Sequence, residues 1–311
     1  MIDEFVLGDS VNVIKSIPDD YVHAIISDIP YGIGYEDWDV LHNNANSALG
    51  GASAAQIEMG GLFKRRGKPL NGWSAADKLI SLEYQNWCGL WASDWLRVLK
   101  PGGSCFVFAG RRYSHRCVVA LEDGGFTLKD VLAWEKSSAP HRAQRISEIY
   151  KRRGDNRNSL KWKGWRVANL RPLFEPILWF QKPYRIGGTI ADNMLEYGVG
   201  AWNEQALETY NLNDESTYSN VLKVKADKND RGLHSTQKPL KLMECLISLV
   251  TKKGQIVLDP FAGSGTTCVA AKCLDRRYIG IEIDEKIFNI AKKRLSDLVK
   301  QSSFREFVAT V

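Results

Sequence analysis

One glycine-rich segment, at residues 259–267, constrains the fold of this 311-residue chain more than any other feature. The segment reads D-P-F-A-G-S-G-T-T, and it lies between an apolar run at 255–258 and a helical pattern that extends to Leu274. A further apolar run at 278–283 completes a strand–helix–strand unit. Small residues at the amino end of a helix let the backbone approach a ligand closely. The sequence therefore predicts an α/β sheet with a ligand site at the ends of its strands.

The spacing within this segment restricts the class of ligand. It matches neither G-x-G-x-x-G nor G-x-x-x-x-G-K-[ST], which disfavours a dinucleotide or a nucleoside triphosphate. Glu282 follows Asp259 by 23 residues and ends the next predicted strand, where a carboxylate can accept hydrogen bonds from ribose hydroxyls. The pattern indicates a nucleoside-containing cofactor, and the alternative is an ordinary turn with a solvent-exposed glutamate.

A second motif, D-I-P-Y-G at residues 28–32, follows the apolar run at 24–27. Ligands of open α/β sheets bind at this edge, where the strands end. A carboxylate beside a constrained backbone and an aromatic ring suits a planar substrate whose amino group is held while its ring is stacked. An ordinary turn from strand to loop is the alternative.

The rest of the chain alternates between strand and helix patterns, which favours an α/β fold. Aromatic and apolar residues at helical spacing over 84–98 are predicted to pack in the core. Residues 100–103, K-P-G-G, are predicted to end that helix and to turn into a strand at 104–109. Residues 32–77 are predicted to form a long loop, and residues 184–233 are the best candidate for a separate small module.

Positive charge is concentrated in one part of the chain. Residues 136–185 contain 13 Lys and Arg residues and three acidic residues, whereas the other 261 residues contain 29 basic and 33 acidic residues. A basic segment on a slightly acidic body favours a polyanionic partner, most simply nucleic acid. A solvated charged surface is the alternative.

Composition disfavours several other classes of protein. The apolar runs are all shorter than the roughly 18 to 20 residues of a membrane helix, and the amino terminus lacks the pattern of a secretory signal. The six cysteines are irregularly spaced and form no C-x-x-C, which argues against a zinc site or a disulfide framework. We therefore expect a globular protein of the reducing cytoplasm.

Three motifs together resemble those of the S-adenosylmethionine-dependent DNA amino-methyltransferases. Residues 28–31 resemble the catalytic tetrapeptide D-P-P-Y, and residues 259–266 match the cofactor loop D-P-F-x-G-S-G-T at every fixed place. Residues 234–239, H-S-T-Q-K-P, resemble the family segment H-P-T-Q-K-P. Because the tetrapeptide precedes the cofactor loop, the chain is similar to the permuted group of this family.

The chain departs from the family pattern at two positions, where Ile29 and Ser235 replace proline. Ile29 still supplies a main-chain carbonyl, which is the group that the family mechanism uses at that position. Asp28 resembles the adenine-N6 enzymes, whereas S-P-P-Y is more usual in the cytosine-N4 enzymes. The resemblance covers about residues 1–136 and 234–294, together with one short strand between them.

The resemblance implies a Rossmann-like α/β fold, the circularly permuted methyltransferase fold, with a mostly parallel seven-stranded sheet and a small target-recognition module. It assigns residues 1–140 to the catalytic part of the core and residues 234–311 to its cofactor-binding part. Residues 141–233 are assigned to DNA contact and target recognition, with a core strand near 174–181.

The reaction implied by the resemblance is methyl transfer from S-adenosylmethionine to the N6 amino group of adenine in a specific sequence of duplex DNA. S-adenosylhomocysteine is the product, and no metal takes part. The Asp28 carboxylate and the Ile29 carbonyl are expected to accept hydrogen bonds from the two N–H groups of the amine. Tyr31 is expected to stack on a base that has been flipped out of the duplex.

The same resemblance implies three sets of site residues. The predicted catalytic residues are Asp28, Ile29, Pro30 and Tyr31. The predicted cofactor-binding residues are Asp9, Thr236, Lys238, Asp259, Phe261, Gly263, Ser264, Gly265, Thr266 and Glu282. The predicted DNA-binding residues are Lys64, Arg65, Arg66, Arg142, Arg145, Arg152, Arg153, Arg157, Lys161, Lys163 and Arg166.

Within the cofactor set, Glu282 is expected to bind the ribose, and Thr236 and Lys238 the methionine carboxylate. Asp9 has two interpretations, as a contact of the cofactor adenine or as a helix N-cap. Three other functions stay open: cytosine-N4 methylation by the same fold, methylation of a protein glutamine amide, and DNA binding without catalysis. The resemblance also leaves open a homodimer and a cognate restriction endonuclease, and no motif of the chain gives the recognition sequence.

Overall fold

The computed structural model describes residues 2–32, 75–136, 139, 143–167, 170–211, 218–224 and 237–309. Several sequence predictions therefore fall outside the described residues. These predictions are most of the long loop at 32–77, which contains Lys64, Arg65 and Arg66, and the roles of Arg142 and Thr236.

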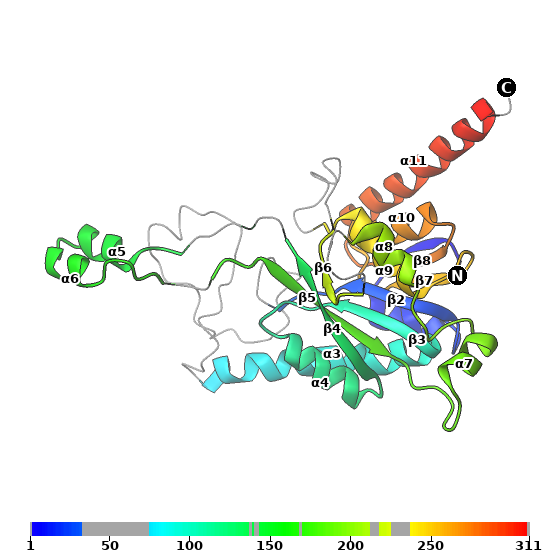
Figure 1. Ribbon diagram of the computed structural model, residues 1–311, viewed down its shortest axis with the longest axis horizontal. Coiled ribbons are helices and arrows are strands. Elements are labelled where there is room, and N and C mark those ends of the chain that lie inside the picture. The colour runs from blue at the N-terminus through cyan, green and yellow to red at the C-terminus, as the bar shows by residue number, and fades with distance from the viewer. Residues whose placement is uncertain are drawn as a thin grey trace.

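The described residues form one sheet of eight strands in the order β1-β8-β7-β2-β3-β5-β4-β6 (Figure 1). Neighbouring strands are parallel except at β5, which runs antiparallel to both β3 and β4. The strands are β1 (Glu4–Leu7), β2 (Val22–Asp28), β3 (Leu99–Phe108), β4 (Thr127–Glu135), β5 (Phe174–Gln181), β6 (Val221–Leu222), β7 (Ile256–Asp259) and β8 (Arg277–Glu282). The predicted α/β fold with a mostly parallel sheet is confirmed. The sheet has eight strands in place of the expected seven, and one of them, β6, is only two residues long.

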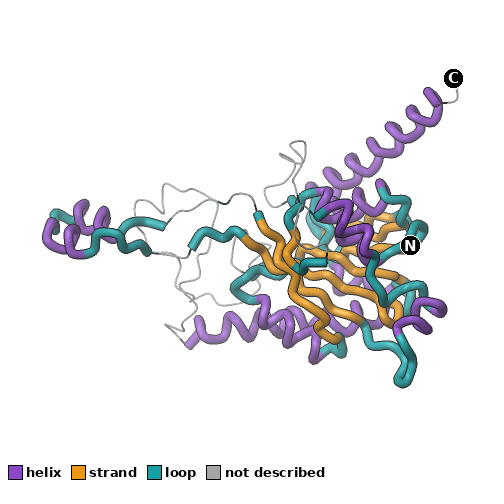
Figure 2. Tube along the Cα trace, viewed as in Figure 1, coloured by secondary structure: helices purple, strands orange, loops and turns teal. Residues whose placement is uncertain are grey.

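Helices cover both faces of this sheet (Figures 1 and 2). One face carries α3 (Ala75–Val98) and α4 (Ser114–Asp123), and the other carries α8 (Glu204–Tyr210), α9 (Leu240–Val250) and α10 (Thr266–Cys273). The remaining helical segments are α1 (Ser10–Val13), the 3₁₀ turn η1 (Ile14–Ser16), α5 (Ile146–Arg152), α6 (Asn156–Lys161), α7 (Ile190–Glu196) and α11 (Glu285–Ala309). Within the described ranges, no helix combines the length and the apolar character that crossing a membrane requires.

The central strands are apolar on both sides because helices cover both faces. Ile25 and Val107 pack with the α3 side of the core, whereas Ile26 and Phe106 pack with the α9 side. The helical pattern predicted at 84–98 is confirmed as part of α3, and its tryptophans Trp91 and Trp95 are fully buried.

The junction between α3 and β3 differs from the prediction. Residues 100–103 are part of β3, which begins at Leu99, so the predicted turn there is wrong. Val22 of β2 pairs with Leu99 and Ala24 pairs with Ser104, so the extra residues of β3 form an irregularity in the strand pairing. Gly102 has a φ of +77° in this irregularity, a conformation that glycine adopts without strain. The proline and glycines therefore produce an irregularity within the strand.

A helical hairpin between β4 and β5 stands apart from the sheet (Figures 1 and 2). It consists of α5 and α6, and an isolated β-bridge pairs the segments on either side of them. Next to the sheet, the main-chain N–H of Lys136 donates to the carbonyl of Leu173. The segment between β4 and β5, which we call the α5–α6 insertion, therefore leaves and rejoins the sheet at adjacent points.

The described part of residues 184–233 belongs to the core, so its interpretation as a separate module is wrong. Strand β6 pairs with β4, and Ala206 and Leu207 of α8 are buried on the α9 side of the sheet. Asn193 of α7 donates to the carbonyl of Pro101 in β3. The segment contributes a few fully buried side chains to a covering layer, and this explains why its overall composition is polar.

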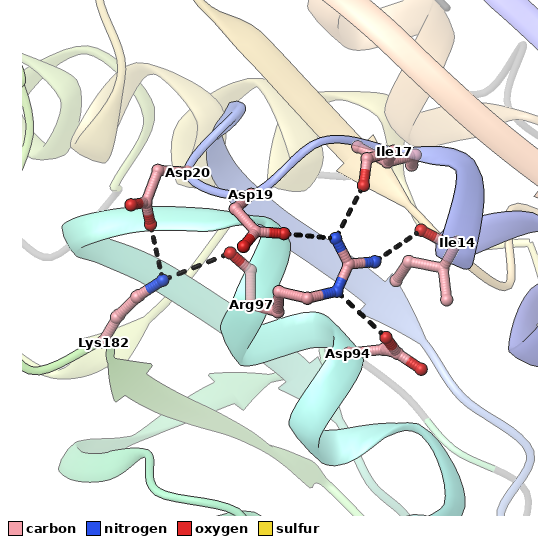
Figure 3. Close-up of polar contacts among 7 residues, drawn as sticks. All are labelled: Ile14, Ile17, Asp19, Asp20, Asp94, Arg97 and Lys182. Atoms are coloured by element: carbon pink, nitrogen blue, oxygen red, sulfur yellow. Dashed lines mark hydrogen bonds and ion pairs between the residues drawn. The ribbon is translucent and has the colours of Figure 1, made fainter.

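Arg97, near the end of α3, joins several segments at the amino edge of the sheet (Figure 3). Its guanidinium donates to the main-chain carbonyls of Ile14 at 3.0 Å and Ile17 at 2.8 Å. It also pairs with Asp19 at 2.7 Å and with Asp94 at 3.1 Å. A single side chain thus holds the turn after α1 against the end of α3.

Lys182, which follows β5, extends this arrangement. Its ammonium donates to Asp20 at 2.6 Å and to the carbonyl of Arg97 at 3.2 Å (Figure 3). We refer to the charged members of this group as the amino-edge cluster. They are Asp19, Asp20, Asp94, Arg97 and Lys182.

Candidate active site

A cavity of about 730 Å³ opens at the carboxyl edge of the sheet, where β1, β8, β7 and β2 end side by side. Its size is that of a pocket for a ligand larger than a simple metabolite. The predicted catalytic and cofactor-binding residues that line it are Asp9, Asp28, Ile29, Pro30, Tyr31, Lys238, Asp259, Phe261, Gly263, Ser264, Thr266 and Glu282. The structure therefore brings together two motifs that are more than 200 residues apart in the sequence.

The glycine-rich turn between β7 and α10 forms one wall of the cavity. Gly263 has a φ of +52°, and a Cβ added there would meet nothing within 4 Å, so the backbone is open to a ligand. Gly265, with a φ of +78°, precedes α10 and packs against Ala291 of α11. Arg294 of α11 donates to the carbonyl of Ser264 at 2.5 Å and thereby fixes the turn from behind.

Asp259 holds the same turn from within the sheet. Its side chain is 3% exposed, and it accepts hydrogen bonds from the Ser27 hydroxyl at 2.7 Å and from the Phe261 main-chain N–H at 3.2 Å. Burial raises the pKa of Asp259 to about 7. This carboxyl group therefore ties the turn to β2.

Glu282, at the end of β8, lies directly opposite the turn. One carboxylate oxygen accepts from the Gly263 N–H at 2.9 Å, and the other accepts from the Asp284 N–H at 2.8 Å. Burial raises the pKa of this carboxyl group. Asp9 lines the cavity and also caps α1, since its side chain accepts from the Val11 N–H, so the predicted N-cap interpretation is confirmed.

The walls between these polar groups are apolar. The cavity is lined by Trp87 and Leu90 of α3, by Phe261 of the turn, and by the isoleucines at positions 283 and 287. Phe261 packs against Trp87, with ring centroids 5.6 Å apart. A close-approach glycine, a carboxylate at the strand end and flat apolar walls fit a nucleoside-containing cofactor.

The other half of the cavity contains a cluster of charged side chains. The Lys238 ammonium lies 2.5 Å from Asp28 Oδ2, 3.2 Å from Glu175 Oε1 and 3.0 Å from the Tyr31 hydroxyl. The Tyr31 hydroxyl is 3.0 Å from Asp28 Oδ1 and also contacts Glu175, so it can donate to either carboxylate. Lys136 pairs with the second oxygen of Glu175. We refer to these five residues as the carboxyl-edge cluster.

The two carboxylates of this cluster differ in acidity. Burial raises the pKa of Asp28; Lys238 lowers it and Glu175 raises it, and the net direction is upward. Burial also raises the pKa of Glu175, but Lys238 and Lys136 outweigh burial and hold that pKa at about 2. Glu175 is therefore firmly ionised, whereas the charge on Asp28 is more sensitive to its partners.

Comparison with known proteins agrees with this geometry. The family model described as DNA methylase matches residues 22–293. The chain is 61% identical over 296 residues to the Type II methyltransferase M.HindIII of Haemophilus influenzae. The alignment covers 95% of this chain and 96% of the relative. The chain belongs to the DNA methylase family. The predicted membership of the DNA methyltransferases is thereby confirmed.

Solved structures show the same fold as this methylase. The PvuII DNA methyltransferase (cytosine-N4-specific) aligns with a TM-score of 0.59 and 17% identity over 94% of this chain and 86% of that chain. TTHA0409 of Thermus thermophilus, in complex with S-adenosyl-L-methionine, aligns with a TM-score of 0.56 and 19% identity over 94% and 93% of the two chains. These likenesses support the permuted α/β architecture.

Several residues of the methylase site were not predicted from the sequence, and three of them are charged residues that hold other groups in place. Arg294 gave no signal, since one arginine on a helix is ordinary. Glu175 did give one, because it is the acidic residue within the otherwise apolar run at 174–180, and the structure buries it, with 9% of its side chain exposed. Lys136 is the third residue, and its role depends on that of Glu175.

Two further side chains of the cavity have polar atoms available to a ligand. The indole N–H of Trp134 and both amide atoms of Gln237 are buried and have no hydrogen-bond partner among the described residues. Both side chains line the cavity next to the carboxyl-edge cluster. A substrate that presents hydrogen-bond donors and acceptors can satisfy them.

The predicted DNA-binding residues that are described lie together on the α5–α6 insertion and its flanks. All are exposed, and no ion pair joins them to another residue of the described ranges. They are Arg145, Arg152, Arg153, Arg157, Lys161, Lys163 and Arg166. Trp162, the C-cap of α6, packs edge to face with Trp165, which is 60% exposed. The insertion therefore presents an unneutralised basic surface.

Proposed function

We propose that this methylase transfers a methyl group from S-adenosylmethionine to the N6 amino group of adenine at a specific site in duplex DNA. The observation that carries the proposal is one cavity lined both by the Asp28 carboxylate and by the glycine-rich turn with its partner Glu282. One side of this cavity suits the nucleoside part of the cofactor, and the other suits an amino group.

The cofactor is assigned to the half of the cavity that holds the glycine-rich turn. Glu282 accepts hydrogen bonds from the ribose hydroxyls, and Gly263 allows close approach of the backbone. Asp9 and the apolar walls at Trp87 and Phe261 surround the adenine. When bound, the cofactor supplies an electrophilic methyl group on a sulfonium.

Asp28 orients the amine. An exocyclic amine is a poor nucleophile because its lone pair is delocalised into the ring. If the Asp28 carboxylate and the Ile29 carbonyl accept hydrogen bonds from its two N–H groups, the nitrogen would become pyramidal and its lone pair would be available for methyl transfer. The bound cofactor would supply the methyl group and leave as S-adenosylhomocysteine, and the amine would give up one of the two protons held by Asp28 and Ile29.

Base flipping brings the target to this position, because the amino group of a stacked base cannot reach the cavity. The ring of Tyr31 is the proposed stacking surface, and the free groups of Trp134 and Gln237 are the proposed partners of the base edge. Asp28, as in D-P-P-Y, favours adenine over cytosine.

The α5–α6 insertion is the proposed DNA-contacting part, within residues 141–233, and the flanking segments 1–140 and 234–311 form the catalytic and cofactor-binding parts. Its arginines and lysines bind phosphates, and each released counterion makes binding depend on salt. Lys161→Ala and Lys163→Ala should each weaken DNA binding and reduce the slope of log affinity against log salt by about 0.9. Lys253→Ala is the matched control, because Lys253 is exposed and pairs with Asp275 away from the cavity.

Incubation with methyl-labelled S-adenosylmethionine and unmethylated duplex DNA, followed by nucleoside identification, tests the reaction. We expect the label in N6-methyladenine. It should be lost in Asp28→Ala and retained in Asp123→Ala, which removes an exposed carboxylate of α4. Label only in N4-methylcytosine overturns the choice of adenine. Intact cofactor binding without label in any base shifts the function to a protein glutamine or to DNA binding alone.

As part of the same proposal, the enzyme works in the cytoplasm in a restriction–modification system, as the Type II designation of its relative suggests. A cognate endonuclease and a homodimer are its proposed partners. Protection of methylated DNA from cleavage tests the first, and sedimentation of the purified enzyme tests the second.

A further inference from the structure

Glu175 is an unusual residue for its position. It lies in β5, whose next five residues are all buried, and burying a carboxylate is unfavourable unless charges and hydrogen bonds compensate. The compensation here comes from three donors, which are Lys136, Lys238 and the Tyr31 hydroxyl. These donors come from three separate parts of the chain, so Glu175 is the point where they meet.

The direction of β5 explains how Glu175 reaches the cavity. Ile177 of β5 pairs with Phe108 of β3, and Phe108 pairs with Asp28 of β2. Because β5 is antiparallel, its first residues lie at the edge where the other strands end. Glu175 and Asp28 therefore lie at the same edge of the sheet, on β5 and β2, with only β3 between them. They are separated by 147 residues of sequence.

Lys238 forms an ion pair with the Asp28 carboxylate, which is the group that the proposed reaction requires. Its ammonium is 2.5 Å from the Asp28 carboxylate and its side chain is 8% exposed. If the target amine takes that carboxylate, Lys238 loses one anionic partner while its own side chain is almost fully shielded from water. A buried ammonium left without a partner is strongly unfavourable. Glu175, at 3.2 Å from the same ammonium, is the second anion available.

We propose that Glu175 is a positioning residue for methyl transfer: it keeps hold of Lys238 and Tyr31 while Asp28 exchanges its contact with Lys238 for the amino group of the target base. This inference rests on the proposed function of Asp28. The cluster contains two lysines and two carboxylates, so its net charge is zero before and after a neutral amine enters. The exchange therefore leaves no charge unpaired.

The titratable groups around Asp28 determine the expected pH dependence. They are Tyr31 on the same segment, Glu175 of β5, Lys136 after β4, Lys238 before α9 and Asp259 of β7. Asp28 must be ionised to accept the amine, so its pKa sets the acid limb of kcat/KM. Glu175 raises that pKa and Lys238 lowers it. Removing one charge or the other must move the limb in opposite directions.

Glu175→Gln tests the proposal. Without the second anion, Lys238 stays on Asp28 and competes with the amine, so kcat should fall by about 10-fold to 100-fold and KM for DNA should rise. The acid limb should move to lower pH. Affinity for S-adenosylhomocysteine, measured by calorimetry, should stay within about twofold of the wild type. Glu175→Asp restores the charge and should recover part of kcat.

Two further variants make the test decisive. Lys238→Met should move the acid limb to higher pH, opposite to Glu175→Gln, and it carries the test together with Glu175→Asp if Glu175→Gln does not fold. Glu135→Gln is the matched control, since Glu135 is a half-exposed neighbour that pairs with Lys223. It should leave kcat, KM and the acid limb unchanged.

The outcomes separate this inference from the proposed function. If Glu175→Gln keeps the wild-type kcat, KM and acid limb while Asp28→Ala is inactive, Glu175 has no positioning role and the proposed function stands. A fall in S-adenosylhomocysteine affinity in Glu175→Gln or Lys238→Met places the pair on the cofactor and also overturns the inference. Absence of methylation in the wild type contradicts the proposed function itself.

Discussion

Charged side chains cluster at both edges of the sheet, and the two clusters differ in burial and in what they bind. At the amino edge, Arg97 donates to two main-chain carbonyls and pairs with Asp19, whose side chain is 74% exposed. At the carboxyl edge, Glu175 and Lys238 are 9% and 8% exposed and bind other side chains around a cavity.

The comparison shows that similar ion pairs have different uses. Charged groups that stay near water keep most of their solvation. The ion pairs of the amino-edge cluster can therefore hold loop ends in place at little cost in solvation. Buried charges lose much more, and replacing them by apolar groups is often neutral or stabilising. The carboxyl-edge cluster is therefore better explained by chemistry than by stability. The following predictions test that division, from the largest expected effect to the smallest.

Asp28→Asn should separate activity from stability. The neutral amide cannot orient the amine, so we expect kcat to fall by about 100-fold to 1,000-fold, or about 3 to 4 kcal/mol in the barrier. The free energy of unfolding should change little, because burial disfavours the charge of Asp28 in the fold, whereas Lys238 loses one anion and keeps Glu175. Methylation assays and urea unfolding measure the two quantities. A large loss of stability in this variant would remove the contrast between the clusters.

Arg97→Ala should give the opposite result. It removes the Arg97 donor from the carbonyls of Ile14 and Ile17, of which Ile14 keeps the Ile17 N–H, and it also removes the ion pairs with Asp19 and Asp94. We expect the free energy of unfolding to fall by about 3 kcal/mol. The kcat of the folded protein should be unchanged, because the cavity lies at the other edge. Arg97→Lys should recover part of the loss. A reduced kcat in folded Arg97→Ala would show that the two edges are coupled.

His23, at the amino end of β2, should make stability depend on pH. Burial, together with Lys100, lowers the pKa of His23 to about 4, and its Nδ1 accepts from the Ile256 N–H. Between the unfolded pKa of 6.5 and about 4, the unfolded chain binds more protons, so the free energy of unfolding should decrease as pH falls through this range. A pKa lowered from 6.5 to about 4 corresponds to about 3 kcal/mol, and because the His23 ring is partly exposed, solvent screening reduces the expected decrease to about 2 kcal/mol.

His23→Asn is the variant for this measurement, because its side-chain oxygen can also accept from Ile256 and it has no proton to gain. Urea unfolding at several values between pH 4 and pH 6.5 should show a smaller decrease in the variant. Equal slopes in the two proteins would mean that His23 is not the titrating group.

Lys182→Ala should have the smallest effect. Lys182 donates to Asp20, whose side chain is 47% exposed, and to the Arg97 carbonyl. We expect the free energy of unfolding to fall by about 0.5 to 1 kcal/mol, and by less in 0.5 M salt, because salt screens partly exposed pairs. Thermal unfolding with and without salt measures it. An effect as large as that of Arg97→Ala would indicate that Lys182 is a main anchor of this edge.

Much of the cavity was predictable because its residues follow strand ends. Asp28, Asp259 and Glu282 each end an apolar run, and carboxyl ends of parallel strands meet at one edge. A local sequence pattern was therefore sufficient to predict that these residues lie close together. The α3 core was predictable for a similar reason, since its spacing of large side chains repeats with the helix.

The carboxyl-edge cluster was not predictable to the same degree. Glu175 reaches Asp28 only because β5 runs against its neighbours, and no local pattern in β5 gives that direction. At residues 100–103 the predicted turn was wrong, because Leu99 already pairs with Val22 of β2, and Gly102 and Gly103 form main-chain hydrogen bonds with Lys182 after β5. The prediction of a separate module at residues 184–233 was wrong because it rested on their average polarity. A few buried side chains, such as Ala206 and Leu207, are enough to pack α8 on the sheet.

The adjacent exit and return of the α5–α6 insertion has one more consequence. Glu135 pairs with Phe174, and the Lys136 N–H donates to Leu173, so the two ends of the excursion are joined by main-chain bonds at the sheet itself. Whatever length or sequence lies beyond that junction leaves the spacing of the strands unchanged. A change in the length or sequence of this excursion therefore leaves Lys136 and Glu175, which lie on either side of the junction, in place at the cavity.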